Sequence, residues 1–218
     1  MSYKDEFIKF MVDCGVLTFG DFTLKSGRRA PYFVNTGNYK TGLQLGRLGE
    51  FYAECIKANN LPVETLFGAA YKGIPLAVAC SIALADKFDM NVNYCFNRKE
   101  AKDHGEGGMI VGKQLANGEK VVIIEDVITA GTAVRQVVPI LKEAAAVEIT
   151  GMVISVDRME KGQGDTSAVQ EVYQEFGFNV CPIVTVVDII QAIEKGVVPG
   201  AQEYLDKMIE YRNVYGVK

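Results

Sequence analysis

The hydrophobic pattern is densest between residues 121 and 147. Residues 121–124 are branched apolar side chains in an unbroken run, which indicates a strand buried on both faces. Two carboxylates, Glu125 and Asp126, end the run, and small and hydroxyl residues follow at 129–133. An apolar-periodic run over 134–147 then predicts a helix. The stretch therefore predicts a strand, an acidic strand end, a small-residue loop and a helix start.

The rest of the chain alternates between strand and helix patterns. Helices are expected over 3–14, 42–58, 73–88, 166–176 and 189–215, the last with a break at 199–200. Strands are expected over 19–24, 32–35, 65–68, 92–96, 109–112, 148–156 and 179–187. Strands that alternate with helices predict an α/β fold with a mostly parallel central sheet flanked by helices. Ligands of such sheets gather at the carboxyl ends of the strands, where Glu125, Asp126 and Arg158 fall.

The loop at 129–133 has the chemistry of an anion site. Gly131 allows close approach of the backbone, the threonine hydroxyls donate hydrogen bonds, and the first N–H groups of a helix lack intrahelical partners. The preceding acids repel a phosphate and suit ribose hydroxyls or a metal instead. The combination describes a phosphorylated sugar, and the alternative is an ordinary strand-to-helix turn with a solvated acidic end.

A second polar stretch, 97–108, reads NRKEAKDHGEGG and contains His104, the only histidine of the chain. It is rich in glycine and charge, and we expect a mobile loop between two strands, as in a lid. Its cations, Arg98, Lys99 and Lys102, suit a pyrophosphate leaving group, whose negative charge needs neutralisation. A lone histidine beside lysines is as often an ordinary surface residue.

Composition narrows the function classes. The chain has 218 residues, 49% of them hydrophobic, which suits a single compact domain without an obvious linker or repeat. A net charge of −4 argues against nucleic acid as the main partner. The N-terminus lacks the apolar core of a signal peptide, and the longest small-apolar run, 74–85, is too short to span a membrane. Five scattered cysteines predict reduced thiols and a cytoplasmic location.

Two nucleotide-binding motifs fail on context. Gly107, Gly112 and Lys113 match most of a P-loop, but Gln114 replaces the hydroxyl residue and a turn follows where a helix should begin. No G-x-G-x-x-G sequence follows a strand, so only the generic alternation supports a dinucleotide fold.

Several motifs together resemble the orotate phosphoribosyltransferase family, whose members use 5-phosphoribosyl-1-pyrophosphate (PRPP). These motifs are FTLKSGRRAPYF, GAAYKGIP, FNRKEAKDHGEGG, IIEDVITAGTA and SVDRME, which span about residues 20–160 in the family's order and spacing. The string KEAKDHGEGG is more specific than the loop at 129–133, which the whole superfamily shares. The resemblance implies the type I phosphoribosyltransferase fold as one domain over 1–218. Residues 1–40 and part of the C-terminal helices would form a small β/helical hood over the site.

The resemblance also implies roles for single residues. The loop would cradle the 5′-phosphate, and Glu125 and Asp126 would hold the ribose hydroxyls, although the family is expected to have Asp at position 125. Arg158 would bind the carboxylate of orotate, because a guanidinium offers a planar pair of donors. The residues that would contact PRPP are Lys25, Tyr71, Lys72, Arg98, Lys99, Lys102, His104, Glu125, Asp126, Val127, Ile128, Thr129, Ala130, Gly131, Thr132 and Ala133. Orotate would contact Phe33, Val34, Thr129 and Arg158. Catalysis would depend on Lys99, Lys102, His104 and Asp126.

The implied reaction transfers the phosphoribosyl group from PRPP to N1 of orotate and gives orotidine 5′-monophosphate and pyrophosphate, a step of pyrimidine (UMP) synthesis. It would require Mg²⁺, held by PRPP and water without direct protein ligands. The resemblance further implies a homodimer with active sites shared across the interface.

Three other functions compete with this interpretation. A phosphoribosyltransferase for a purine or uracil is disfavoured by Arg158 and by the string at 97–108. A PRPP-sensing regulator that binds nucleic acid would need a basic surface or a helix-turn-helix, which the acidic pI near 5.2 does not suggest. A subunit similar to PRPP synthetase would need an ATP loop and a longer chain.

Overall fold

A mostly parallel sheet forms the centre of the protein, as predicted. The computed structural model describes residues 1–24, 26–102, 108–128, 130–162 and 164–217, except for the side chains of 101 and 102. Within these residues the strand order is β5-β4-β3-β6-β7-β8, and every neighbouring pair is parallel except β4 with β5. The strands are β3 (Thr65–Gly68), β4 (Asn93–Lys102), β5 (Gly108–Gly112), β6 (Lys120–Ile124), β7 (Glu148–Asp157) and β8 (Val180–Thr185).

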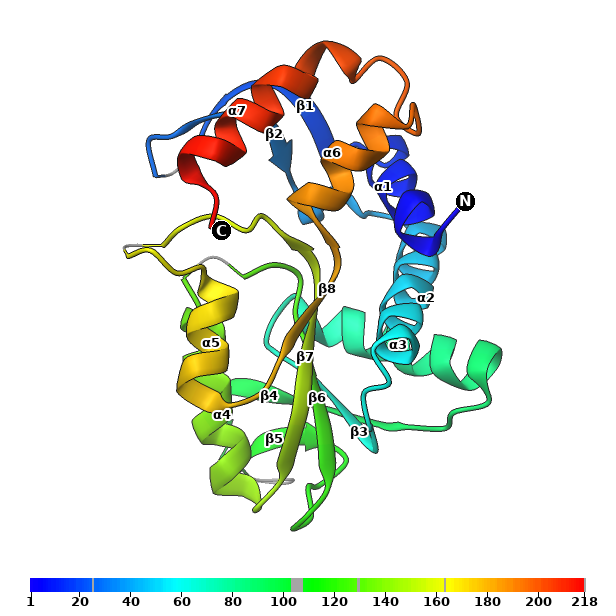
Figure 1. The fold of residues 1–218 in the computed structure, drawn as a ribbon. Helices are drawn as coiled ribbons and strands as arrows, with labels where there is room; N and C mark the ends of the chain where they lie inside the picture. The colour runs from blue at the N-terminus through cyan, green and yellow to red at the C-terminus, as the bar shows by residue number, and fades with distance from the viewer. Residues whose placement is uncertain (25, 103–107, 129, 163, 218) are drawn as a thin grey trace.

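Helices cover both faces of this sheet (Figure 1). One face carries α2 (Gly42–Ala58) and α3 (Gly73–Phe88), and the other carries α4 (Thr132–Ala144) and α5 (Ala168–Phe176). Strand β6 explains the uninterrupted apolar run, because Val122 and Ile124 face the core on one side and Val121 and Ile123 face the core on the other. Each such side chain contributes about 1.5–3 kcal/mol by burial.

A second group of elements lies beyond the carboxyl edge of the sheet (Figure 1). Its hairpin packs against the last helix, where the rings of Tyr32 and Tyr211 meet edge to face with centroids 6.1 Å apart. The first helix packs on β8 and on the helix that follows β8. The elements are α1 (Tyr3–Asp13), β1 (Leu17–Thr23), β2 (Arg29–Val34), η1 (Thr36–Asn38), α6 (Val186–Glu194), η2 (Gln202–Tyr204) and α7 (Leu205–Tyr215).

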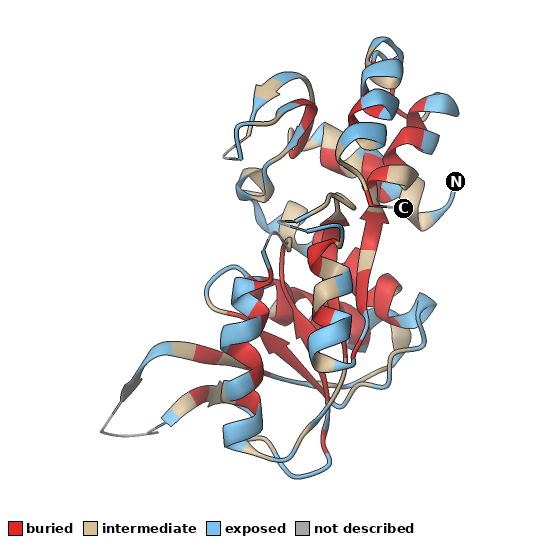
Figure 2. Cartoon of the chain, turned by 60° about the vertical axis from the view of Figure 1, so that its left-hand side comes forward, coloured by how far each residue is buried: buried red, intermediate tan, exposed pale blue. Residues whose placement is uncertain are grey.

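The prediction of a loop throughout 97–108 is wrong. Strand β4 continues to Lys102 and pairs antiparallel with β5, with Asn97 opposite Ile110 and Lys102 opposite Gly108. The pair extends from the sheet as a two-stranded arm (Figure 2). A ribbon of this kind needs backbone hydrogen bonds and little apolar burial, so charged side chains do not prevent it. Residues 103–107 lie outside the described part.

Two predicted elements end earlier than expected. The helix over 134–147 starts at Thr132 and stops at Ala144. The strand over 179–187 stops at Thr185, because the Thr185 side chain caps α6 by accepting a hydrogen bond from the backbone N–H of Asp188 at 3.2 Å. In the described part of the chain, no helix has the length and hydrophobicity that crossing a membrane requires.

Candidate active site

The strand order reverses its direction of progression between β3 and β6. From β3 the chain passes through α3 to β4, and from β6 it passes through α4 to β7 on the opposite side. The loops after β3 and β6 therefore diverge, which is the position where open α/β sheets bind ligands. The turn at 69–73 and the loop at 125–131 both start at this point of the sheet.

Asp126 is buried directly after β6 and is already paired. Its Oδ2 accepts hydrogen bonds from the hydroxyl of Thr36 and from Nζ of Lys72, each at 2.7 Å. Burial alone would raise the pKa of Asp126, but the hydrogen bonds from Lys72 and Thr36 outweigh it and hold the pKa below its usual range. Asp126 is therefore an ionised acceptor at neutral pH.

Glu125, its neighbour, has the opposite electrostatic character. Burial, helped by the negative charge of Asp126, raises the pKa of Glu125 to about 7. Its Oε1 accepts the backbone N–H of Asp126 at 2.9 Å, and its carbonyl accepts the Tyr52 hydroxyl at 2.7 Å. Both acids are only 8% exposed, so the alternative of a solvated strand end is wrong.

The loop after the acids leads directly into α4. Gly131 is the N-terminal cap with φ +68°, a left-handed conformation that favours glycine, and it supplies no side-chain cap. The first N–H groups of α4 are thus available to a ligand anion. Nη1 of Arg135 donates to the carbonyl of Ala130 at 2.7 Å, and the same guanidinium is held by Glu171 and Glu175.

The turn after β3 lies beside the acids at the same edge of the sheet. Tyr71 is 66% exposed there, and Nζ of Lys99 on β4 lies 4.6 Å from the centroid of its ring. The side chain of Asn97 accepts the backbone N–H of Ala70 at 2.9 Å. Gly73 is required by close approach, because a Cβ at this position would lie 2.5 Å from the carbonyl oxygen of Ile124.

A second group of predicted residues lies on β2 and after β7. The guanidinium of Arg158 stacks over the ring of Tyr32 at 5.0 Å, and its Nε donates to Oε1 of Glu160 at 2.8 Å. Phe33 is partly exposed on β2 and Val34 is half-buried. Thr36 follows the same strand and connects this group to Asp126.

The structure brings most predicted site residues to this edge of the sheet. Lys72 pairs with Asp126, Val127 bridges to Val156 of β7, and Ile128, Ala130, Thr132 and Ala133 belong to the loop and the first turn of α4. Arg98 lies in β4, within the segment predicted as a lid, and its Nη1 donates to the carbonyl of Gly108 at 3.2 Å. The predictions for Lys25, His104, Thr129 and the side chain of Lys102 fall outside the described residues.

Sequence reasoning missed Thr36 and Asn97. Asn97 had a usable signal, because a polar residue directly after the expected strand 92–96 falls at the ligand-binding edge. Thr36 had none, since it is 90 residues from Asp126 and no local pattern links the two.

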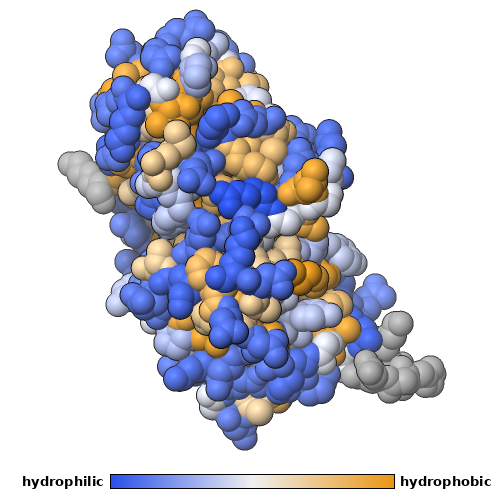
Figure 3. All heavy atoms as spheres, turned by 90° about the vertical axis from the view of Figure 1, so that its right-hand side faces the viewer, coloured by the Kyte–Doolittle hydropathy of each residue, from blue (hydrophilic) through white to orange (hydrophobic). Residues whose placement is uncertain are grey.

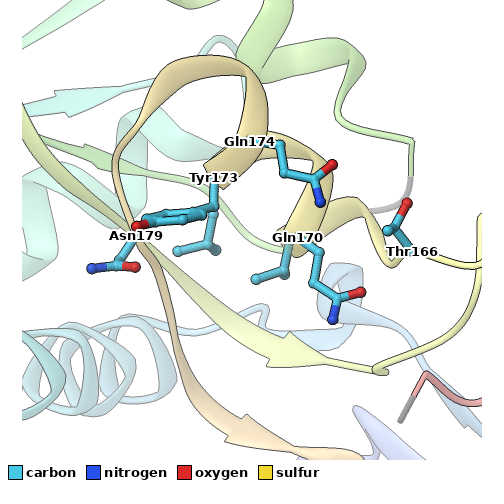
Figure 4. A pocket seen from close by; sticks show the side chains of 7 residues that line it. Thr166, Gln170, Tyr173, Gln174 and Asn179 are labelled. Atoms are coloured by element: carbon cyan, nitrogen blue, oxygen red, sulfur yellow. The ribbon is translucent and has the colours of Figure 1, made fainter.

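A separate hollow lies along α5 and reaches the amino end of β8 (Figure 4). Its lining side chains are neutral and include three amides: Thr166, Val169, Gln170, Tyr173, Gln174, Asn179 and Val180. It lacks charged groups such as Lys72 and Asp126 after β3 and β6. Within the described residues, no group of three or more His, Cys, Asp or Glu side chains has the arrangement of a metal site.

Comparison with known proteins identifies the family. The model of the phosphoribosyl transferase domain matches residues 36–182. The orotate phosphoribosyltransferase of Clostridium beijerinckii is 54% identical over 222 residues, which cover 100% of this chain and 99% of the relative. This chain belongs to the orotate phosphoribosyltransferase family. The family member from Nitrosococcus oceani is 51% identical over 217 residues, with 100% and 97% of the two chains covered.

Solved structures of the family agree with the fold. The crystal structure of the orotate phosphoribosyltransferase of Francisella tularensis has a TM-score of 0.86 and 39% identity, and the match covers 97% of this chain and 99% of the other. The type I phosphoribosyltransferase fold expected from the sequence is therefore confirmed. The Mycobacterium tuberculosis orotate phosphoribosyltransferase in complex with PRPP shares the fold at 18% identity, with a TM-score of 0.63.

Proposed function

We propose that the protein transfers the phosphoribosyl group of PRPP to N1 of orotate and releases pyrophosphate and orotidine 5′-monophosphate, in pyrimidine synthesis. One observation carries the proposal: in a chain related over its full length to orotate phosphoribosyltransferases, the buried acids, the loop before α4 and Arg158 share one edge of the sheet. A phosphorylated sugar and an acidic base have complementary partners at this edge.

The Lys72–Asp126 pair supports the proposed PRPP site. Ribose hydroxyls would donate to Asp126 and Glu125, and the pyrophosphate would accept from Lys72. PRPP would thus separate Lys72 from Asp126 and give each of them a new hydrogen-bond partner. The 5′-phosphate would accept from the first N–H groups of α4, beside Ala130, Gly131 and Thr132. Tyr71 would border the pyrophosphate.

The proposed chemistry depends on position and charge. The anomeric carbon would gain oxocarbenium character as the C–O bond to pyrophosphate breaks and N1 of orotate approaches. Asp126 would stabilise the positive charge of the sugar, while Lys99, Lys102 and His104 would neutralise the departing pyrophosphate. No side chain needs to act as a covalent nucleophile.

The base would lie between β2 and the end of β7. Phe33 and Val34 would supply the apolar side of the base site, Arg158 would bind the orotate carboxylate, and Thr129 would border the base. A base without a carboxylate would leave this guanidinium without a ligand partner, which disfavours uracil and purines.

We propose Mg²⁺ as the required ion, bound through the substrate. Among the described residues no three His, Cys, Asp or Glu side chains are grouped as metal ligands, so the donor set fits an ion carried by PRPP oxygens and water better than one in a protein cage. When bound, the ion supplies positive charge to the pyrophosphate. The protein residues would orient the complex.

The proposal includes a homodimer with shared active sites. The β4–β5 arm extends from the sheet (Figure 2). In the proposed dimer this arm would reach the second chain, so that Lys102 and His104 serve the site of the partner. Apolar side chains also reach the surface in patches among polar ones on the side of α2 and α3 (Figure 3). Ile82 of α3, 56% exposed, is a candidate for burial in such an interface.

The arrangement of the chain around the site is also proposed. Residues 1–40 with α6 and α7 would act as a hood over the base, since α7 packs on β2 and Thr36 contacts Asp126. All five cysteines are free thiols, which is consistent with the proposed cytoplasmic location.

Release of pyrophosphate tests the function directly. The protein would be mixed with PRPP, Mg²⁺ and one base from orotate, uracil, adenine, guanine and hypoxanthine. We expect pyrophosphate only with orotate, together with orotidine 5′-monophosphate in equal amount. Faster turnover of any other base would contradict the proposal, and folded Asp126→Asn protein, which loses the ribose acceptor charge, serves as the control for activity from a contaminant.

A further inference from the structure

We propose that Glu160 is a positioning residue of the base site, which orients Arg158 and is shared between Arg158 and Arg28. The inference rests on the proposed function, because it concerns how the same site selects a base with a carboxylate. It also gives a role in base binding to the chain after residue 160, where the sequence shows no family motif.

Glu160 binds the two arginines through different oxygens. Its Oε1 accepts from Nε of Arg158 at 2.8 Å and lies 2.6 Å from Nη2 of the same side chain. Its Oε2 accepts from Nη1 of Arg28 at 3.2 Å. The Glu160 side chain is 17% exposed and both arginine side chains are 24% exposed, so solvent screens these pairs less than it screens surface pairs.

Each guanidinium is also held by an aromatic ring. Arg158 stacks over Tyr32, and Arg28 lies 4.9 Å from the ring centroid of Tyr215 and donates to the carbonyl of Lys161. Glu160 and Tyr211 hold Nε and Nη2 of Arg158, and the proposal assigns the remaining nitrogen, Nη1, to the ligand. Glu160 therefore decides which donors of Arg158 face the base.

The position of Glu160 is built by the end of the chain. The backbone turns at Met159, which has φ +51°, and Glu160 forms a bridge with Gly216 just after α7. The N–H of Val217 donates to the carbonyl of Met159 at 2.8 Å, and the hydroxyl of Tyr211 donates to Oε1 of Glu160 at 3.0 Å. The C-terminal helix thus holds the residue that orients Arg158.

The charges of this cluster suit one carboxylate. Glu160 compensates one of the two guanidiniums, and one positive charge of the arginine pair is left for a ligand. Without Glu160, Arg158 would lose its Nε partner and would be repelled by Arg28. The guanidinium would then leave the orientation that presents Nη1.

Steady-state kinetics of Glu160→Gln test this role, because the amide keeps the size of the side chain and removes its charge. We expect the KM for orotate to rise about tenfold or more while the KM for PRPP changes less than about twofold. Arg28→Gln should also raise the orotate KM, because Glu160 then cancels the charge of Arg158. In the double variant Arg28→Gln/Glu160→Gln the positive charge of Arg158 remains for the ligand. The orotate KM of the double variant should therefore rise by less than the product of the two single increases.

Glu50→Gln is the matched control. Glu50 on α2 is likewise shared by two cations, Arg47 and Lys87, and its side chain is 22% exposed. Its substitution should leave the orotate KM unchanged. Thermal unfolding of each variant identifies effects that arise from loss of the fold alone.

Several outcomes would overturn the inference. An unchanged orotate KM, or an equal rise of both KM values, would make Glu160 a structural residue only, and a lower orotate KM would show that it competes with the ligand for Arg158. If Glu160→Gln does not fold, Tyr211→Phe, which removes one hydrogen bond to Glu160, must still raise the orotate KM selectively. A wild-type protein that makes no orotidine 5′-monophosphate would contradict the proposed function itself, a result distinct from an active wild type with an unaffected variant.

Discussion

At the carboxyl end of β6, two adjacent acids experience different electrostatic surroundings. Asp126 has Lys72 and Thr36 as donors, whereas the side chain of Glu125 accepts from a backbone N–H next to a negative charge. The pKa of Asp126 is therefore lowered and that of Glu125 is raised. Single contacts of this kind give each acid its own pH dependence.

The raised pKa of Glu125 predicts a pH dependence of stability. The pKa of Glu125 in the folded state is about 7, so the folded protein keeps this proton up to about that pH, whereas the unfolded chain releases it near the ordinary glutamate pKa of 4.5. The folded state thus binds more protons within this interval, and the Glu125 contribution to the free energy of unfolding should fall as the pH rises through it. Chemical denaturation at about pH 5 and about pH 8 measures the free energy of unfolding at both ends of this interval. Between the two pH values, this free energy should fall less for Glu125→Gln than for wild type. An identical pH profile for wild type and variant would contradict the raised pKa.

Arg158 carries the prediction for base choice. Arg158→Leu removes the charge-assisted hydrogen bonds to the base, which contribute about 1.5–3 kcal/mol. The orotate KM should therefore rise about tenfold to a hundredfold, with a much smaller change for PRPP. Initial rates with each substrate varied in turn measure both constants. Equal changes would show that Arg158 does not select the base.

At the scale of elements, the start of α4 is held by its own first turns and by α5. Arg135 of α4 donates to the Ala130 carbonyl and pairs with Glu171 and Glu175 of α5. Ion pairs this exposed contribute little to stability. Their consequence is geometric, because they fix the carbonyl of the loop whose N–H groups would face the phosphate.

Arg135→Met should therefore separate binding from stability. We expect the PRPP KM to rise several-fold, because the loop loses its anchor, while the thermal unfolding midpoint changes little. Lys9→Met is the control, since it also removes a solvent-exposed ion pair on a helix, with Asp13 of α1. A PRPP KM equal to that of the control would show that the loop holds its shape without Arg135.

At the scale of the whole molecule, the predicted site residues fall into two sets, one at the edge of the sheet and one in the arm formed by β4 and β5. Lys72, Asp126 and the α4 loop lie at the sheet edge, whereas Lys102 is the last residue of β4 and lies opposite Gly108 in the arm. In a shared-site dimer, the second set would serve the partner. The contact of Lys99 with Tyr71 is made within one chain, so residues farther along the arm are the ones to test.

Mixing two inactive variants tests this arrangement. Lys102→Ala should lower kcat more than it raises the PRPP KM, because a lid cation acts mostly on the departing pyrophosphate. Asp126→Asn damages the other set. After subunit exchange, half of the dimers would be mixed with one intact site of two, so activity should return to about a quarter of wild type. An inactive mixture in which mass spectrometry confirms exchange would show that the arm serves its own chain.

The sequence by itself determined the elements whose burial is local and periodic. The residue ranges predicted for β3, α2 and α3 are those of the structure, because buried faces, flanking turns and caps such as Thr41 act over a few residues. The acids after β6 were also placed correctly at a carboxyl edge, since parallel strands end together. The family motifs supplied the candidate residues for the loop and the base.

Only the tertiary structure decided which distant side chains meet. Thr36 reaches Asp126 across 90 residues, and Glu160 owes its surroundings to Tyr211 and the chain end. The strand through 97–102 likewise exists because β5 pairs with it, against its polar composition. Such contacts depend on how separate elements pack and in which register they pair, and a local pattern of apolar and polar residues carries no information about either.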